Sequence, residues 1–177
     1  MSGIVETAAC AVAAVGAGAA GGVYLAFSAM VMPALNSRPA GEAVATMQRI
    51  NEMAVRPPFM TVFFGGALAS AVVAVSSITA GTVAQEGPLR VAGAGLALAG
   101  VAVTIGFNVP RNNALAGVAV TIGFNVPRNN ALARIDAAGA GAADSWRTFE
   151  RAWNRANTVR CALSIAGAAA LAASLAR

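Results

Sequence analysis

Four long apolar stretches dominate the sequence, at about residues 8–35, 59–80, 89–107 and 159–176. A helix needs about 20 mostly apolar residues to cross the hydrocarbon core of a bilayer, and each stretch approaches or exceeds that length. The stretches are rich in Ala and Gly and lack the polar–apolar alternation of membrane strands. They therefore predict an all-α integral membrane four-helix bundle, in which residues 1–177 form a single membrane domain.

The charge content of the chain agrees with a lipid environment. Only 11% of its 177 residues are charged, whereas a soluble domain usually carries about 25%. The net charge of +5 would suit a nucleic acid, but the chain has no Lys and its Arg residues lie between the apolar stretches. We therefore expect the lipid bilayer, and not nucleic acid, as a partner; a homo-oligomer is left open.

The distribution of Arg residues predicts the orientation in the membrane. Three lie in segment 36–58 and seven in segment 108–160, whereas the opposite side carries only Arg90 and Arg177. By the positive-inside rule, both long connections face the cytoplasm and both termini face outward, as in a multi-pass protein of the cell membrane. Because no basic stretch precedes the first apolar run, we expect a retained span and not a cleaved signal peptide.

The sequence predicts neither a metal site nor a disulfide. It has no His, a common ligand of protein-bound metals, and its two Cys residues have no CxxC partner. In the predicted topology Cys10 lies near the outer face and Cys161 near the inner face, which is too far apart for a disulfide.

Two helical segments are expected outside the spans. Residues 40–55 predict a short interfacial helix, with Arg49 and Glu52 directed outward. Four residues at helical spacing form its apolar face: Val44, Met47, Ile50 and Ala54. The fourth helix is expected to begin ahead of its apolar stretch, near Asp144, which is a suitable N-cap.

A 17-residue segment, ALAGVAVTIGFNVPRNN, occurs twice in succession, at 97–113 and 114–130. Seventeen residues make about 4.7 helical turns, so the two copies cannot occupy equivalent positions on one helix. The apolar part of the second copy is too short to cross a bilayer; it could be re-entrant, interfacial or a register alternative to the first. We expect one copy at the functional position and favour the first, which keeps the third span at a normal length.

The polar end of the repeat is the first candidate site. Asn108, Arg111 and Asn112 lie where the third span is expected to meet the cytoplasmic side. Asn108 and Asn112 are four residues apart and share a face if the backbone is helical. The segment either ends the helix at Pro110, with Arg111 reaching to the interface, or forms the polar floor of a pocket inside the bundle.

The fourth helix carries the second candidate site. Residues spaced by three and four form one stripe: Trp146, Phe149, Trp153, Asn157 and Arg160. The stripe is either an interfacial aromatic belt with an Arg anchor or the wall of a site for a flat, partly anionic polycycle. Phe27 on the first span and Asn51 on the short helix are further candidates, each of which packing alone would also explain.

The order of four motifs, VYLAFSAMVMPAL, MQRIN…RPPFM…FFG, FNVPRNNALA and WNRANTVR, resembles the anthrone oxygenase-like family over nearly the whole chain. These are small four-helix integral membrane proteins, many of them grouped only as a domain of unknown function. The resemblance implies a cofactorless, metal-free oxygenase that oxidises anthrone-like phenolic polycycles to quinones with molecular oxygen. It therefore implies a lipophilic aromatic small molecule as substrate.

This function assigns roles to the candidate residues. The catalytic candidates are Arg160, Asn157, Asn108 and Asn112. Arg160 would supply a cation for the developing oxyanion, and the three Asn side chains would orient the oxygens. The substrate-binding candidates are Trp153, Arg111, Asn51 and Phe27. Glu52 and Glu150 are the nearest candidates for a base. The alternative is a non-catalytic membrane scaffold or assembly partner, since Ala- and Gly-rich spans pack without any site.

Overall fold

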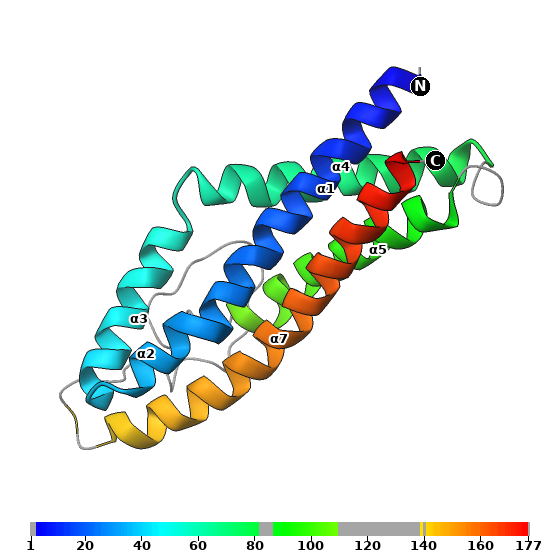
Figure 1. The fold of residues 1–177 in the computed structure, drawn as a ribbon. Helices are drawn as coiled ribbons and strands as arrows, with labels where there is room; N and C mark the ends of the chain where they lie inside the picture. Colours follow the sequence, from blue (N-terminus) through cyan, green and yellow to red (C-terminus); the bar gives the residue numbers. More distant parts are fainter. Residues whose placement is uncertain (1–2, 82–86, 110–138, 140, 177) are drawn as a thin grey trace.

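A computed structural model describes residues 3–81, 87–109, 139 and 141–176 of the chain. Within these residues the structure is helical and contains no strand (Figure 1). Its four long helical segments are apolar enough to cross a membrane: Gly3–Asn36, Phe59–Thr79, Pro88–Asn108 and Ala142–Leu175. The predicted all-α membrane bundle is therefore confirmed, and each predicted apolar stretch overlaps one of these segments.

The first and third spans each contain a π-helical turn, which the sequence pattern did not predict. The first span runs through α1 (Gly3–Ala26), the π-helical turn η1 (Phe27–Val31) and α2 (Met32–Asn36). The third span runs through α5 (Pro88–Val103) and ends in a second π-helical turn, η2 (Thr104–Asn108). In each turn a backbone N–H donates to the carbonyl five residues earlier. Such turns are rare and are frequent at functional sites.

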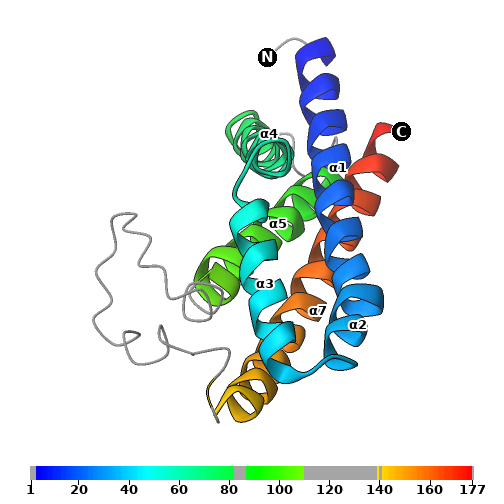
Figure 2. The same cartoon turned by 90° about the vertical axis from the view of Figure 1, so that its left-hand side faces the viewer.

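The start of α1 and the end of α7 (Ala142–Leu175) lie at the same end of the bundle, as Figures 1 and 2 show, and glycines bring the helix backbones together there. A Cβ atom on Gly16 would lie 2.5 Å from the Cα of Gly66 on α4 (Phe59–Thr79). A Cβ atom on Gly167 would lie 2.9 Å from the backbone N of Ala97. Five further buried residues complete this glycine end: Cys10, Ala13, Val73, Ala94 and Leu171. Small residues allow this close approach of backbones in lipid.

Large side chains fill the opposite end of the bundle. The short helix α3 (Ala40–Ala54) packs there against α2 and α7. The buried cluster, which we call the aromatic end, consists of Met32, Leu35, Ala43, Val44, Met47, Trp146, Phe149 and Trp153. Ile50 packs against it, while Arg49 and Glu52 form an exposed ion pair at 2.6 Å. The predicted apolar face of this helix is thus buried mainly against protein.

The last helix, α7, has 34 residues and is therefore about 51 Å long, well beyond the roughly 30 Å of a hydrocarbon core. Its N-cap is Gly141, so the prediction that Asp144 caps the helix was wrong. Asp144 instead lies in the first turn, where its carboxylate pairs with Arg147 three residues along the helix. The extra length carries the aromatic residues of α7 to α2 and α3.

Candidate functional site

A buried cation lies on α7 between two aromatic rings. The side chain of Arg160 is only 6% exposed. Its guanidinium carbon lies 4.1 Å from the centroid of the Tyr24 ring and 5.0 Å from that of the Trp153 ring. The salt bridges among the described residues join other, exposed side chains, and none of them includes Arg160. The aromatic faces therefore supply much of the stabilisation of this charge.

Asn157 holds the guanidinium in place. Its side-chain oxygen accepts hydrogen bonds from Nε and Nη2 of Arg160, at 3.0 and 2.8 Å. Its side-chain nitrogen donates to the backbone carbonyl of Tyr24 at 2.8 Å and to the hydroxyl of Ser28 at 2.6 Å. The Asn157 side chain has no exposed surface, and it joins α7 to α1 through a buried bond and to η1 through a partly buried bond.

Both π-helical turns contribute to this polar cluster. Ser28 belongs to η1, and Tyr24 comes just before that turn. Thr104, the first residue of η2, has its hydroxyl 3.2 Å from the hydroxyl of Tyr24. Thr104 also donates to the carbonyl of Gly100 at 2.9 Å, so Tyr24 donates to Thr104 in the bond that joins their hydroxyls. The cluster therefore links the first, third and fourth spans.

Asn108 is the last residue of η2, which packs against α7. Its side chain has no exposed surface, and among the described residues neither its nitrogen nor its oxygen has a hydrogen-bond partner. A buried amide left unpaired costs about 1–3 kcal/mol per polar atom, so such groups are rare outside functional sites. Both a donor and an acceptor of Asn108 are thus available to a bound molecule.

The remaining candidate residues differ in where they lie relative to Arg160. The stripe on α7 faces inward, because Trp146, Phe149, Trp153, Asn157 and Arg160 are all buried, which contradicts the interfacial-belt interpretation. Phe27 lies beside it, with its ring centroid 5.4 Å from that of Trp153. Asn51 lies half-buried on α3, and its side-chain nitrogen is buried with no hydrogen-bond partner in the part of the chain that the structure describes. Arg111 and Asn112 lie outside the described residues.

Neither candidate base faces the buried cation. Glu52 is paired with Arg49 on the exposed side of α3. Glu150 accepts hydrogen bonds from Asn36 and Asn154. Both carboxylates are therefore engaged with other side chains; the sequence offers them only as the nearest candidates for a base, and that role stays a prediction.

Sequence reasoning did not include Tyr24, Ser28 and Thr104 among the site residues. Tyr24 is the only Tyr of the chain. It precedes Ser28 by four residues, a spacing that places both side chains on one face of a helix and that could have indicated a shared site. The contribution of Tyr24 through its backbone carbonyl could not be read from the sequence, because every residue offers the same carbonyl acceptor.

The part of this site that lies on α7 belongs to a segment that matches a known protein family. Residues 115–170 match the family model described as anthrone oxygenase. The resemblance to the anthrone oxygenase family is thereby confirmed. The match includes Trp153, Asn157 and Arg160, and it begins inside the second copy of the repeat at 114–130. No curated protein and no solved structure matches the chain.

The segment that matches the anthrone oxygenase family begins in the second copy of the repeat, whereas the third span of the structure contains the first copy. The third span is built from the first copy up to Asn108, whereas the second copy lies outside the described residues. The match instead runs from the second copy into α7. Because the two copies are identical in sequence, either can supply the residues of the motif.

Proposed function

We propose that this chain is a membrane-embedded oxygenase that oxidises a lipophilic, anthrone-like phenolic polycycle to a quinone. The observation that carries the proposal is the buried guanidinium of Arg160, which no carboxylate pairs among the described residues. A cation held at membrane depth favours an anionic ligand, because the attraction is strong where water is scarce. The match to anthrone oxygenase supports the choice of substrate class.

The reaction balances with dioxygen as the only oxidant. A methylene carbon between two aromatic rings loses a proton, and the resulting carbanion, stabilised as a phenolate-type oxyanion, forms a carbon–oxygen bond with dioxygen. The removed proton returns to the peroxide oxygen, and the hydroperoxide then loses water to leave a carbonyl group. Carbon loses four electrons, one oxygen atom enters the quinone and the other leaves as water.

The residues of the site supply binding and charge stabilisation for this reaction. Arg160 stabilises the oxyanion, and Asn157 keeps the guanidinium fixed, so little reorganisation accompanies the charge development. Trp153 and Phe27 offer rings for stacking against a flat substrate, and Asn108 offers a free donor and acceptor. Arg111, Asn112 and Asn51 remain candidates for contacts at the rim of the site.

The proposal includes a membrane orientation. An even number of spans brings the start of α1 and the end of α7 to the same side of the membrane, as Figure 1 illustrates. The Arg-rich connections lie on the other side, which the positive-inside rule assigns to the cytoplasm. The aromatic end would then face the cytoplasm, with Arg160 near that boundary of the hydrocarbon core.

The test is quinone formation by the protein purified in lipid nanodiscs and supplied with an anthrone under oxygen. Arg160→Met should lower the rate by about 100-fold or more, because it removes the cation that stabilises the oxyanion. Arg160→Lys should restore only part of the rate, since an ammonium lacks the planar face that stacks on both rings. The matched control is Arg155→Met, on an exposed turn of the same helix, which should keep the full rate.

A non-catalytic scaffold is the second candidate function, and one observation favours it. The rings of Tyr24 and Trp153 cover the cation, with Phe27 packed against Trp153, and the cavity that Tyr24 borders measures about 20 Å³, too little for a polycycle. Substrate entry would therefore require these rings to move. If the folded protein forms no quinone above the protein-free background, the scaffold function replaces the oxygenase.

A further inference from the structure

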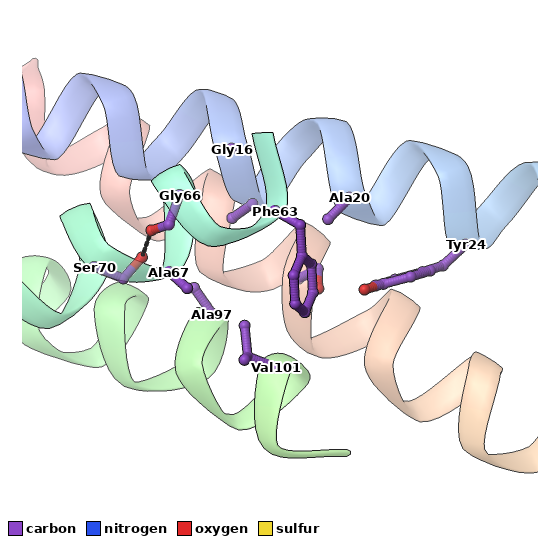
Figure 3. Close-up of a pocket in the computed structure, with 11 residues that line it drawn as sticks. Gly16, Ala20, Tyr24, Phe63, Gly66, Ala67, Ser70, Ala97 and Val101 are labelled. Atoms are coloured by element: carbon purple, nitrogen blue, oxygen red, sulfur yellow. Dashed lines mark hydrogen bonds between the residues drawn. The ribbon is translucent and has the colours of Figure 1, made fainter. Parts of the chain in front are cut away.

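We propose that the small cavity beside Tyr24 is a binding site for dioxygen, an inference that rests on the proposed oxygenase function. The cavity lies among α1, α4, α5 and α7 and has a volume of about 20 Å³. About 10–15 Å³ is enough for one water-sized molecule, so the cavity admits a diatomic gas but no organic substrate. Figure 3 shows Phe63 and Tyr24 reaching toward it, with Ala97 and Val101 on α5.

The lining of the cavity suits an apolar guest. Most of the residues around it are glycines, alanines or other apolar residues, such as Ala20, Phe63, Ala97 and Val101. Of its hydroxyl groups, Ser70 donates to the carbonyl of Gly66 in its own helix, at 2.8 Å (Figure 3). The hydroxyl of Tyr24 is bonded to Thr104, which leaves the hydroxyl of Ser164 as the one polar partner of this kind that the described residues offer to a guest. A water molecule usually needs two to four polar partners, whereas dioxygen needs none.

The position of the cavity connects it to the cation. Tyr24 borders the cavity, and the face of its ring lies 4.1 Å from the guanidinium carbon of Arg160. Ser164, which also lines the cavity, lies one helical turn beyond Arg160 on α7. The cavity is therefore one turn deeper in the membrane than the oxyanion site. Dioxygen dissolves well in lipid hydrocarbon, so it would reach the carbon from the apolar side.

Glycines create this space. A Cβ atom on Gly100 would lie 2.8 Å from the hydroxyl oxygen of Ser164, at the wall of the cavity. Gly16 and Gly66, which also line it, approach each other so closely that neither tolerates a side chain. The helices therefore meet on one side of the cavity through backbone alone, and alanine methyl groups leave the centre open.

The first test measures oxygen occupancy without turnover. Protein with ¹³C-labelled alanine methyl groups is placed in nanodiscs and equilibrated with dioxygen or nitrogen under equal pressure. The paramagnetic relaxation of the Ala20 and Ala97 methyl groups should be several-fold larger than that of Ala13 and Ala94. These controls lie in the same spans, are fully buried and do not line the cavity. Equal relaxation of both pairs, or cross-relaxation of the cavity methyl groups with water alone, would overturn the proposal.

The second test uses turnover. Ala97→Val fills part of the cavity and should raise the KM for dioxygen about tenfold, with the KM for the anthrone unchanged. Val101→Ile is a milder filling variant, should Ala97→Val fail to fold, and Ala162→Val on the exposed face of α7 is the control. An unchanged KM for dioxygen in a folded filling variant contradicts the assignment. Selective oxygen relaxation without any quinone formation overturns the oxygenase function while supporting oxygen binding.

Discussion

At the glycine end of the bundle the helices meet through backbone atoms, whereas at the aromatic end they meet through rings, with a charge and buried amides at its border. The glycine end contains Gly16, Gly66 and Gly167, and its polar contacts are few, such as those that Ser174 makes with the carbonyl of Leu171 and the thiol of Cys10. The border of the aromatic end holds Arg160 and Asn157, which contact the ring and the carbonyl of Tyr24 on α1.

The glycine end can be explained by helix packing, whereas the surroundings of Arg160 point to a function. Close backbone contact needs only small residues, which lipid-embedded helices use widely, so the glycine end requires no ligand to explain it. A buried cation with an amide network is costly in a membrane and is seldom retained without a role. Substitutions at the glycine end should therefore act mainly on stability and, where they fill the cavity, on the KM for dioxygen, whereas those near Arg160 should affect both stability and the rate of quinone formation.

The largest loss of stability is expected at the glycine end. Gly66→Val would place a Cβ atom 2.8 Å from the Cα of Gly16, so α1 and α4 must separate. We expect the free energy of unfolding to fall by about 3 kcal/mol. The measurement is denaturant unfolding in detergent, followed by circular dichroism. Gly22→Val is the control, because a Cβ there meets nothing within 4 Å; an equal loss in both variants would contradict the contact argument.

A smaller loss is expected from Asn157→Leu, by about 2–3 kcal/mol. The substitution leaves the Arg160 guanidinium without its acceptor and the carbonyl of Tyr24 without the side-chain donor. The same unfolding measurement applies, with quinone formation as a second readout that should fall along with it. Asn154→Leu, which loses a bond to Glu150 near the surface, should cost less than about 1 kcal/mol. An equal loss of unfolding free energy in the two variants would contradict a special role for the buried bonds of Asn157.

Ser28→Ala should have a still smaller effect, about 1 kcal/mol, because Asn157 keeps the carbonyl of Tyr24 as its other acceptor. We expect the rate of quinone formation to change more than the stability, since the guanidinium loses part of its positioning. Ser76→Ala is the matched control, as its hydroxyl bonds only the carbonyl of Val73 in its own helix. A rate that changes equally in both variants would argue against a positioning role for Ser28.

The smallest effect is expected from removing one copy of the repeat. Deleting 97–113 or 114–130 gives the same sequence of 160 residues (177 − 17), because the copies are identical. Shortening the connection between the third span and α7 should change the free energy of unfolding by less than about 1 kcal/mol. Unfolding of the 160-residue chain measures this, and its quinone formation should match that of the full chain. Loss of the fold would show that both copies are needed for it.

The spans were predictable because backbone groups in lipid must be satisfied within a helix, so length and apolar composition suffice to find them. The stripe on α7 was predictable for a similar reason, since spacings of three and four place Trp153, Asn157 and Arg160 on one face. Which way that face points was not predictable. An inward site and an outward aromatic belt share the same spacing, and only the packing of α1 and α3 distinguishes them.

The partners of the site residues could not be predicted because they depend on tertiary contacts. Asn157 bonds Tyr24 and Ser28 across about 130 residues of sequence, a pairing that no local pattern encodes. A role for Glu52 or Glu150 as a base stays a prediction; Glu52 pairs with Arg49 in its own helix, and Glu150 bonds Asn154 in its own helix and Asn36 on α2. The local pattern of the sequence contained no sign of the two π-helical turns.

The π-helical turn η1 has a consequence for the phase of the first span. An α-helix advances about 100° per residue, so an extra residue would rotate everything after it unless a wider turn absorbs that residue. Tyr24 faces the cation on one side of this turn, while Met32 and Leu35 face the aromatic end on the other. Removing one residue, such as Ala29, would restore the α-helical winding and keep both sets of side chains on their present faces. Adding one residue to the α-helical part of the span would instead swing Met32 and Leu35 by about 100° away from their cluster and uncouple the two regions of the bundle.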